Sequence, residues 1–432
     1  MRESVETGSL CLLQREKLTP KQLNQMSESF QRRIPDNPII GDTFRGCLLA
    51  GAVGDALGAP VEFMKRRQIV TRYGEPGIRD YPKNNDGKAK ALITDDTQLA
   101  LFTAEGLLRA HVRCCTQEVR SFSEAFVNVA AHAYLRWLYT QGETNPLLET
   151  DKLDGRLIEH KELFARRAPG NTCLSSLRDM RRHFANPRIA FNNSKGCGGV
   201  MRVAPVGMFF AAGKRFGDLA RREQLAFEMG LQLAALTHGH PTGYLSSGAF
   251  ALIVMLLLEG QSLRETIGTA LQHLTNYDQH EETLDAIQKA LAAATNSPNH
   301  FDTLASLGEG WVAEEALAIA LYAALSTDEM PMTDAAKNQG DSQAHLQSRF
   351  ERGIVLAVNH SGDSDSTGAI CGNLLGAMYG QKAIPPRWLE PLELRNVIEE
   401  TADDLATFES WDIQNPPTSP EHHYYMTRYP GW

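Results

Sequence analysis

The chain is poor in the patterns that mark strands, disulfides and membrane spans. Strand-like alternation of apolar and polar residues is scarce. The seven cysteines include no CxxC pair and are odd in number, which argues against a disulfide framework and a zinc ribbon. The longest apolar run, from Ala249 to Leu258, is too short to cross a bilayer and predicts a buried helix. Because the N-terminus also lacks a signal-peptide core, we expect a cytoplasmic protein without a membrane partner.

An excess of basic residues is also absent. The formal net charge is -9 at pH 7, which argues against a nucleic-acid or anionic-lipid partner, because such partners favour a basic surface. Hydrophobic residues make up 42% of the 432 positions and charged residues 22%, as in globular proteins. A chain of this length can bury the core of one large domain or of two smaller ones.

Helical periodicity dominates what is present, and it predicts an all-α core. Apolar residues recur at spacings of three and four in residues 44–57, 98–111, 122–139, 223–236, 244–258, 263–274, 282–293, 312–325, 367–379 and 391–408. Segments 46–58 and 368–380 are unusually rich in glycine and alanine. Glycine costs a helix up to about 1 kcal/mol relative to alanine, and close packing has to recover that cost. We therefore expect these two helices to lie at the centre.

Two acidic clusters, TDDT at 94–97 and DSDST at 363–367, each begin a predicted helix. If folding brings them together, like charges at ~4 Å repel by on the order of 4 kcal/mol at an effective dielectric of ~20, and a cation would relieve that repulsion. Asp, Ser and Thr oxygens suit Mg, Mn or Ca. Alternatively, each cluster caps its helix, a role that is compatible with metal binding. An EF-hand is excluded because Leu374 stands where that loop needs glutamate.

A glycine-rich segment at 192–202, NNSKGCGGVMR, is the third informative feature. Its three glycines can expose backbone N–H groups to a phosphate, with Lys195 or Arg202 supplying charge. The spacing matches neither the Walker loop nor the dinucleotide fingerprint. A tight turn before a helix is the alternative interpretation.

Six motifs follow one another in an order that resembles the ADP-ribosylglycohydrolase family. They are GAVGDALGAPVE at 51–62, TDDT at 94–97, SKGCGGVMR at 194–202, THGHP at 237–241, GWVAEEAL at 310–317 and SGDSDSTG at 361–368. The resemblance runs from about Phe44 to Tyr379. It implies a compact, single-domain, all-α orthogonal helical bundle with a binuclear Mg²⁺ or Mn²⁺ centre. It also implies an enzyme that removes ADP-ribose from modified protein side chains.

The resemblance assigns roles to individual residues. The implied metal ligands are Thr94, Asp95, Asp96, Asp363, Asp365 and Ser366. The residues matching the loop that holds the diphosphate are Ser194, Lys195, Gly196, Cys197, Gly198 and Gly199, and His238 matches a histidine near the ligand. Ser366 stands where the family usually has threonine, and it keeps the hydroxyl oxygen.

Glu62 matches an acidic position near the scissile bond, and we expect Glu62 and Asp96 to move the proton. Glycoside cleavage builds positive charge on the ribose, which nearby carboxylates stabilise, while a metal ion orients a water molecule. Which of the two is the acid and which the base stays open. Without the resemblance, Glu62 would be an ordinary surface carboxylate, and His238 and His240 core or capping histidines.

The motifs do not encode the acceptor from which ADP-ribose is released. The form of the loop at 196–199 looks bacterial, and arginine is the acceptor commonly associated with bacterial members. We therefore predict an ADP-ribosylarginine hydrolase. A noncatalytic relative is argued against because the acidic clusters and Glu62 are intact.

The family domain is expected at 39–410, with an extension on each side and one insertion within it. Residues 1–38 form a polar extension with one expected helix that starts at Thr19-Pro20. This extension suggests a second function, an immunity protein that neutralises an ADP-ribosylating toxin by binding it, although a loose tail fits as well. Residues 326–347 are expected to be a flexible insertion. Residues 411–432 are expected to be a strap that packs on the surface or borders the substrate cleft.

Overall fold

The regular structure of the chain is helical, as the sequence predicts. The structure, a computed structural model, describes residues 38–84, 86–148, 153–181, 189–328, 342–413 and 419–431. Across these ranges the only β-type pairing consists of isolated bridges, such as the one between Gly196 and Val312. Residues 1–37, with the helix expected at Thr19-Pro20 and nearly all of the proposed toxin-binding extension, lie outside the described residues.

Every segment with helical periodicity is a helix. The longer helices are α2 (Pro38–Gly58), α3 (Arg66–Tyr73), α4 (Asp95–Thr116), α5 (Phe122–Thr140), α6 (Asn171–Arg178), α7 (Ala204–Ala212), α8 (Leu219–Ala235), α9 (Pro241–Leu258), α10 (Leu263–Leu274), α11 (Glu281–Asn296), α13 (Ala313–Asp328), α15 (Ser342–Val358), α16 (Ser364–Tyr379), α18 (Arg395–Thr407) and α19 (Pro420–Arg428). Two short ones are α12 (Phe301–Leu304) and α17 (Pro386–Leu389). The pattern missed α3, α6, α7, α15 and α19. For α7 the reason is that its residues are apolar on all sides, so no periodicity shows.

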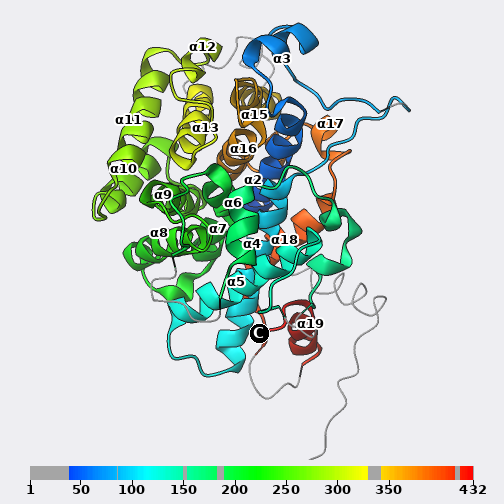
Figure 1. The fold of residues 1–432 in the computed structure, drawn as a ribbon, viewed down its shortest axis with the longest axis vertical. Helices are drawn as coiled ribbons and strands as arrows, with labels where there is room; N and C mark the ends of the chain where they lie inside the picture. Colours follow the sequence, from blue (N-terminus) through cyan, green and yellow to red (C-terminus); the bar gives the residue numbers. More distant parts are fainter. Residues whose placement is uncertain are drawn as a thin grey trace, which may run out of the picture.

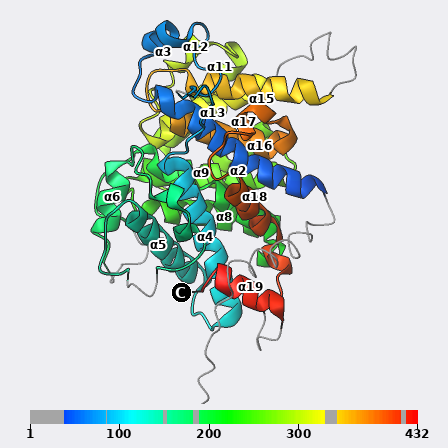
Figure 2. The same ribbon diagram turned by 90° about the vertical axis from the view of Figure 1, so that its right-hand side faces the viewer.

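The two glycine-rich helices, α2 and α16, lie side by side in the middle of the molecule (Figures 1 and 2). A Cβ atom on Gly54 would lie 1.9 Å from the carbonyl oxygen of Gly368, and one on Gly372 would lie 2.0 Å from that of Ala50. Only glycine permits backbones to approach so closely. This confirms the expected central position. It also brings the C-terminal end of α2 to the start of α16, since a Cβ on Gly58 would lie 2.2 Å from the oxygen of Ser364.

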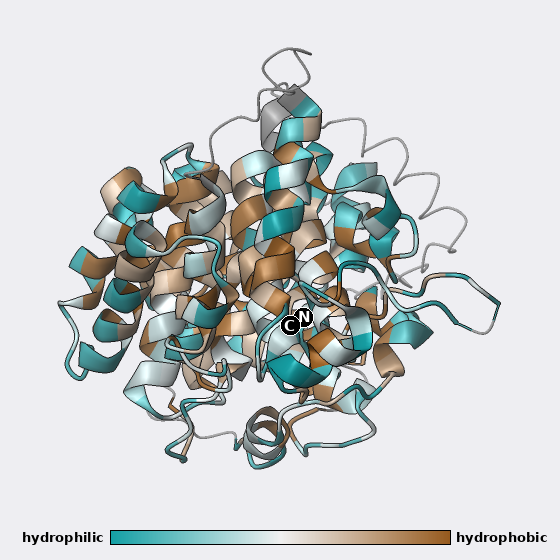
Figure 3. Ribbon diagram, turned by 90° about the horizontal axis from the view of Figure 1, so that it is seen from above, coloured by the Kyte–Doolittle hydropathy of each residue, from teal (hydrophilic) through white to brown (hydrophobic). Residues whose placement is uncertain are grey.

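Apolar residues concentrate on the inner helices and polar residues on the periphery (Figure 3). The buried apolar side chains between Phe44 and Tyr429 form one cluster. Helix α9 is long and apolar enough to cross a membrane, yet 83% of its apolar window is buried inside the fold. The run from Ala249 to Leu258 is therefore part of a buried core helix, as predicted.

The insertion predicted at 326–347 is shorter than expected. Ser326 and Thr327 belong to α13 and are fully buried, and α15 begins at Ser342. Residues 329–341 lie outside the described residues. The end of α13 was missed because Ser326 and Thr327 are small and polar, and whether such residues are buried depends on their neighbours in the fold.

The C-terminal strap packs against α18 and the distal half of α4. The Trp411 ring stacks on Tyr425 with centroids 3.8 Å apart, and Arg428 Nε donates to Asp404 Oδ2 at 2.7 Å. Arg109 Nη1 of α4 donates to the Pro430 carbonyl at 3.3 Å. These contacts lie away from the first turn of α4, where the acidic residues are.

Candidate functional site

The two acidic clusters of the sequence meet at the N-termini of α4 and α16. Thr94 caps α4 by accepting a hydrogen bond from the Asp96 N–H, and Asp363 caps α16 by accepting one from the Ser366 N–H. One carboxylate oxygen from each of Glu62, Asp363 and Asp365 lies within 4.8 Å of the others. The capping interpretation is therefore confirmed for Thr94 and Asp363. The two clusters also lie close together, because the charge of Asp363 contributes to raising the pKa of both Asp95 and Asp96.

Asp55 is a central residue of this site to which sequence reasoning gave no role. It lies on α2, is fully buried, and accepts hydrogen bonds from Thr94 N at 3.0 Å, Thr97 N at 3.2 Å and Thr97 Oγ1 at 2.5 Å. It thereby fixes the first turn of α4 against α2. The available signal was that Asp55 is the one carboxylate in the glycine- and alanine-rich segment 46–58.

We call Asp55, Glu62, Asp95, Asp96, Asp363 and Asp365 the acidic cluster. Burial raises the pKa of Asp95, of Asp96 and of Asp365 well above its usual range, and neighbouring carboxylates raise each pKa further. Burial, followed by the charge of Asp363, raises the pKa of Glu62 to about 8. In the described part of the chain no lysine or arginine forms an ion pair with the cluster. The cluster therefore cannot be fully ionised at neutral pH without an added cation.

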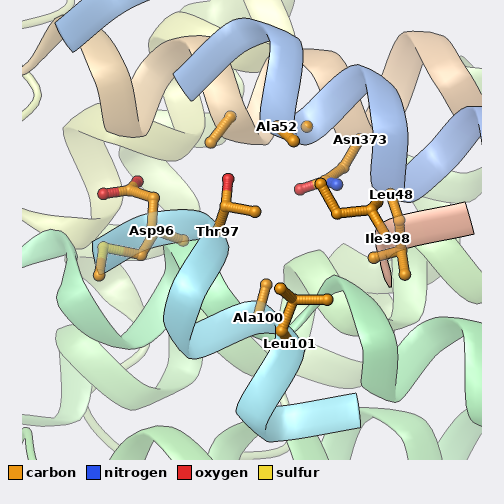
Figure 4. A pocket seen from close by; sticks show the side chains of 11 residues that line it. Leu48, Ala52, Asp96, Thr97, Ala100, Leu101, Asn373 and Ile398 are labelled. Atoms are coloured by element: carbon orange, nitrogen blue, oxygen red, sulfur yellow. The ribbon is translucent and has the colours of Figure 1, made fainter. Parts of the chain in front are cut away.

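Asp96 carries an oxygen that the fold leaves unbonded. Its Oδ1 atom is buried and has no hydrogen-bond partner among the described residues. Figure 4 shows Asp96 and Thr97 on the first turn of α4, with Thr97 directed at α2 and the apolar side chains of Leu48 and Ile398 lining the same pocket. Buried polar atoms nearly always have a partner, so an unbonded carboxylate oxygen in an acidic cluster suits a cation.

The segment 194–199, which we call the glycine loop, is held next to the acidic cluster. Cys197 Sγ donates to Asp363 Oδ2 at 2.7 Å, a contact that the sequence did not reveal. The loop also pairs with residues 308–313, which we call the brace loop. Cys197 N donates to the Trp311 carbonyl at 3.2 Å and Ala313 N to the Lys195 carbonyl at 2.8 Å.

The brace loop reaches the acidic cluster as well. The Asp363 N–H donates to the Glu309 carbonyl at 2.8 Å. Gly362 has a φ of +128°, and a Cβ on it would lie 2.0 Å from the same carbonyl oxygen, so this close approach requires glycine. One short segment thus fixes the positions of both the glycine loop and the start of α16.

The two cations expected to serve a phosphate have other partners. Lys195 Nζ lies 2.5 Å from Glu314 Oε1 and 2.9 Å from Glu282 Oε2. Arg202 is fully buried, and its guanidinium carbon lies 4.3 Å from the centre of the Tyr134 ring. This differs from the expectation that either side chain supplies charge to a ligand. Ion pairing of this kind cannot be read from local sequence, because the partners are distant along the chain.

The two histidines of the THGHP motif have different environments. His240 caps α9, and its Nδ1 accepts from the Thr242 N–H at 3.2 Å. His238 is buried beneath the glycine loop, where a Cβ on Gly196 or Gly198 would lie 3.5 or 3.3 Å from its Nε2. Burial, together with the charge of Arg202, lowers the pKa of His238 to about 3. His238 is therefore neutral.

Ser194, which was also predicted to contact the diphosphate, begins the glycine loop. Its Oγ accepts from the Gly196 N–H at 3.3 Å and lies 3.0 Å from the Thr172 hydroxyl. Beside the loop, the rings of Phe63 and Trp311 stack with centroids 5.2 Å apart. Phe63 has a φ of +65° and is 67% exposed, so an aromatic pair borders Glu62 at the surface.

Comparisons with known proteins identify the family and several relatives of this chain. The ADP-ribosylglycohydrolase family profile matches residues 36–413. The ADP-ribosylhydrolase ARH3 of Gallus gallus is 24% identical over 392 residues, which cover 84% of this chain and 92% of that protein. The ADP-ribosylarginine hydrolase Tri1 of Serratia proteamaculans is 25% identical over 380 residues, which cover 86% and 81%.

A solved structure described as an ADP-ribosylglycohydrolase-related protein complex superposes with a TM-score of 0.54 at 25% identity. The match covers 85% of this chain and 98% of that one. Together, the family profile and these relatives support an ADP-ribosyl hydrolase activity. The chain belongs to the ADP-ribosylglycohydrolase family.

Proposed function

We propose that this protein is a divalent-metal-dependent hydrolase that releases ADP-ribose from modified arginine side chains. The observation that carries the proposal is the acidic cluster, which is buried, of one sign and adjacent to a glycine loop. The arginine acceptor is suggested by the printed name of the Serratia relative and by the bacterial form of the loop.

The chemistry of the cluster fits a hard cation. Its donors are oxygens, and Asp96 Oδ1 lacks a partner among the described residues. The residues that would hold Mg²⁺ or Mn²⁺ are Thr94, Asp95, Asp96, Asp363, Asp365 and Ser366. Bound there, a divalent ion would orient the ribose hydroxyls and lower the pKa of a water molecule.

Side chains and backbone groups of the protein would transfer the proton, orient the carboxylates and bind the diphosphate. Glu62 is the partly exposed member of the cluster, so it can exchange a proton with the leaving group or with water. Asp55 holds the first turn of α4, and with it Asp95 and Asp96, in a fixed orientation. Lys195 and Arg202 are paired elsewhere, and the Gly196 and Cys197 N–H groups already donate within the fold. The diphosphate would therefore be served by the N–H groups that follow Cys197 at the start of the 3₁₀ helix Cys197–Arg202.

The decisive experiment measures release of ADP-ribose from two matched peptides, one carrying ADP-ribosylarginine and the other ADP-ribosylserine. Wild type and Asp96→Asn are compared in Mg²⁺ and in EDTA. We expect release from the arginine peptide in Mg²⁺, and loss of release in EDTA and in the variant. Release from the serine peptide alone would overturn the arginine acceptor. Undiminished release in EDTA would overturn the metal requirement.

A further inference from the structure

Arg202 and Thr237 are buried polar residues that the proposed mechanism does not use, and they form a chain that ends on His238. Arg202 Nη2 donates to Thr237 Oγ1 at 2.7 Å, and Thr237 Oγ1 lies 2.9 Å from His238 Nδ1. Arg202 and Thr237 are fully buried, and His238 is 1% exposed. The far side of the imidazole, with Nε2, faces Gly196 and Gly198 of the glycine loop.

The single hydroxyl proton of Thr237 has three acceptors within reach. They are His238 Nδ1, the Cys173 sulfur, which is only a weak acceptor, and the Ala234 carbonyl at 3.3 Å. That carbonyl already accepts from the N–H groups of Thr237 at 3.1 Å and His238 at 3.0 Å, which occupy both of its lone pairs. Arg202, a donor only, occupies the other side of the hydroxyl oxygen. The hydroxyl proton therefore points to Nδ1.

A neutral imidazole that accepts at Nδ1 carries its proton on Nε2. We propose that Arg202 and Thr237 are positioning residues that fix His238 in this tautomer, so that its Nε2–H donates to a diphosphate oxygen of the ligand in the glycine loop. This inference rests on the proposed function for the identity of the ligand. It gives a neutral donor to a loop whose neighbouring cations, Lys195 and Arg202, are already paired.

Arg202 also has a structural role, which the test has to separate from positioning. Its Nη2 donates to the Leu233 carbonyl at 2.9 Å in the last turn of α8, where a cation complements the helix dipole. Loss of Arg202 would therefore destabilise the fold whether or not the tautomer matters. Thr237→Val keeps the shape of the side chain and removes only the hydroxyl, and Thr237→Ser restores a hydroxyl as the matched control.

The first measurement is the long-range ¹⁵N–¹H correlation spectrum of ¹⁵N-histidine protein without ligand, with His238 assigned by the signal missing in His238→Gln. We expect a protonated Nε2 and an unprotonated Nδ1 in wild type and in Thr237→Ser. Thr237→Val should show the other tautomer or a mixture. A protonated Nδ1 in wild type would overturn the proposal, and His238→Asn provides the assignment if His238→Gln does not fold.

The second measurement is the affinity for ADP-ribose by calorimetry, with melting temperatures as a check on folding. Loss of one hydrogen bond predicts about tenfold weaker binding by Thr237→Val and near wild-type binding by Thr237→Ser. His238→Gln, whose amide nitrogen falls near Nε2, should bind more tightly than His238→Asn, whose amide falls near Nδ1. Equal affinities in all folded variants would overturn the relay. If wild type fails to bind ADP-ribose, the proposed function fails, while the spectrum still decides the tautomer.

Discussion

Helix α4 contributes to two buried clusters of charged side chains that differ in their balance of charge. At its first turn, the charged side chains around Asp95 and Asp96 are all carboxylates. Further along, Glu105 lies 2.9 Å from Arg136 Nη2 and 3.4 Å from Arg109 Nη2, and Arg109 Nη1 lies 2.9 Å from Asp154. The second group balances its own charge within the fold, whereas the first does not. The difference indicates that the second group serves the structure and that the first is arranged for a charge supplied from outside.

The largest expected effect comes from neutralising one member of the acidic cluster. Asp96→Asn should lower hydrolysis by about 10²- to 10⁴-fold, the range for loss of a positioned acid or base. In EDTA the same change should leave the melting temperature equal or higher, because asparagine replaces a carboxyl group whose ionisation is opposed by burial and by neighbouring carboxylates. Activity assays and thermal melts check both parts. The control is Asp285→Asn on α11, an exposed partner of Lys289, which should change neither.

The cluster around Glu105, in which the charges balance, should instead lose stability when one charge is removed. Arg136→Met removes one partner of a buried pair and should cost about 3–5 kcal/mol of unfolding free energy, because Glu105 keeps a buried charge. Adding Glu105→Gln should recover part of this loss. Urea denaturation measures both, with hydrolysis per folded molecule unchanged. A cost near zero for Arg136→Met would contradict the contrast between the two groups.

A third change sharpens the comparison by moving the acidic cluster without altering its charge. Gly54→Ala places a methyl group against the Gly368 carbonyl and should destabilise the protein by about 1–3 kcal/mol, despite the higher helix propensity of alanine. Activity should fall as well, because Asp55 follows directly. Gly268→Ala on α10 has open space around it and should instead stabilise by about 0.5–1 kcal/mol. Equal effects of the two substitutions on denaturation would show that α2 and α16 do not need close contact.

The smallest effect concerns His238, a buried group kept neutral. Its folded pKa of about 3 lies below the unfolded value of about 6.5, so the unfolded chain binds a proton that the native protein does not. Stability is therefore lost as pH falls below about 6.5. Between pH 7 and pH 5 wild type should lose about 2 kcal/mol more than His238→Gln. Parallel pH profiles would indicate that His238 gains a proton in the native state.

Much of the site could be predicted because its residues occur in short local motifs. The first-turn position of Asp95 and Asp96, and the capping by Thr94 and Asp363, follow from residue types at helix starts. The all-α fold follows from periodicity. The binuclear metal, the arginine acceptor and the role of residues 1–38 in binding a toxin stay predictions, and no feature of the described residues favours the last.

The rest depends on contacts between distant segments. Lys195 is charged in any sequence analysis, but only the fold shows that Glu282 and Glu314 take up its ammonium group. Arg202 stands next to the glycine loop in sequence and yet turns into the core. Asp55 gains its role from α4, and Cys197 from the start of α16. Local residue types do not encode such pairings.

The brace loop makes the site depend on a late step in synthesis of the chain. The acidic cluster draws on residues from Asp55 to Asp365, and the brace loop joins the glycine loop to Asp363. A growing chain that stops short of α16 therefore contains most of the motifs but lacks Asp365 and the α16 helix that Asp363 caps. On the proposed function, a chain that ends before α16 would not bind ADP-ribose, and binding would therefore report that synthesis has continued through α16.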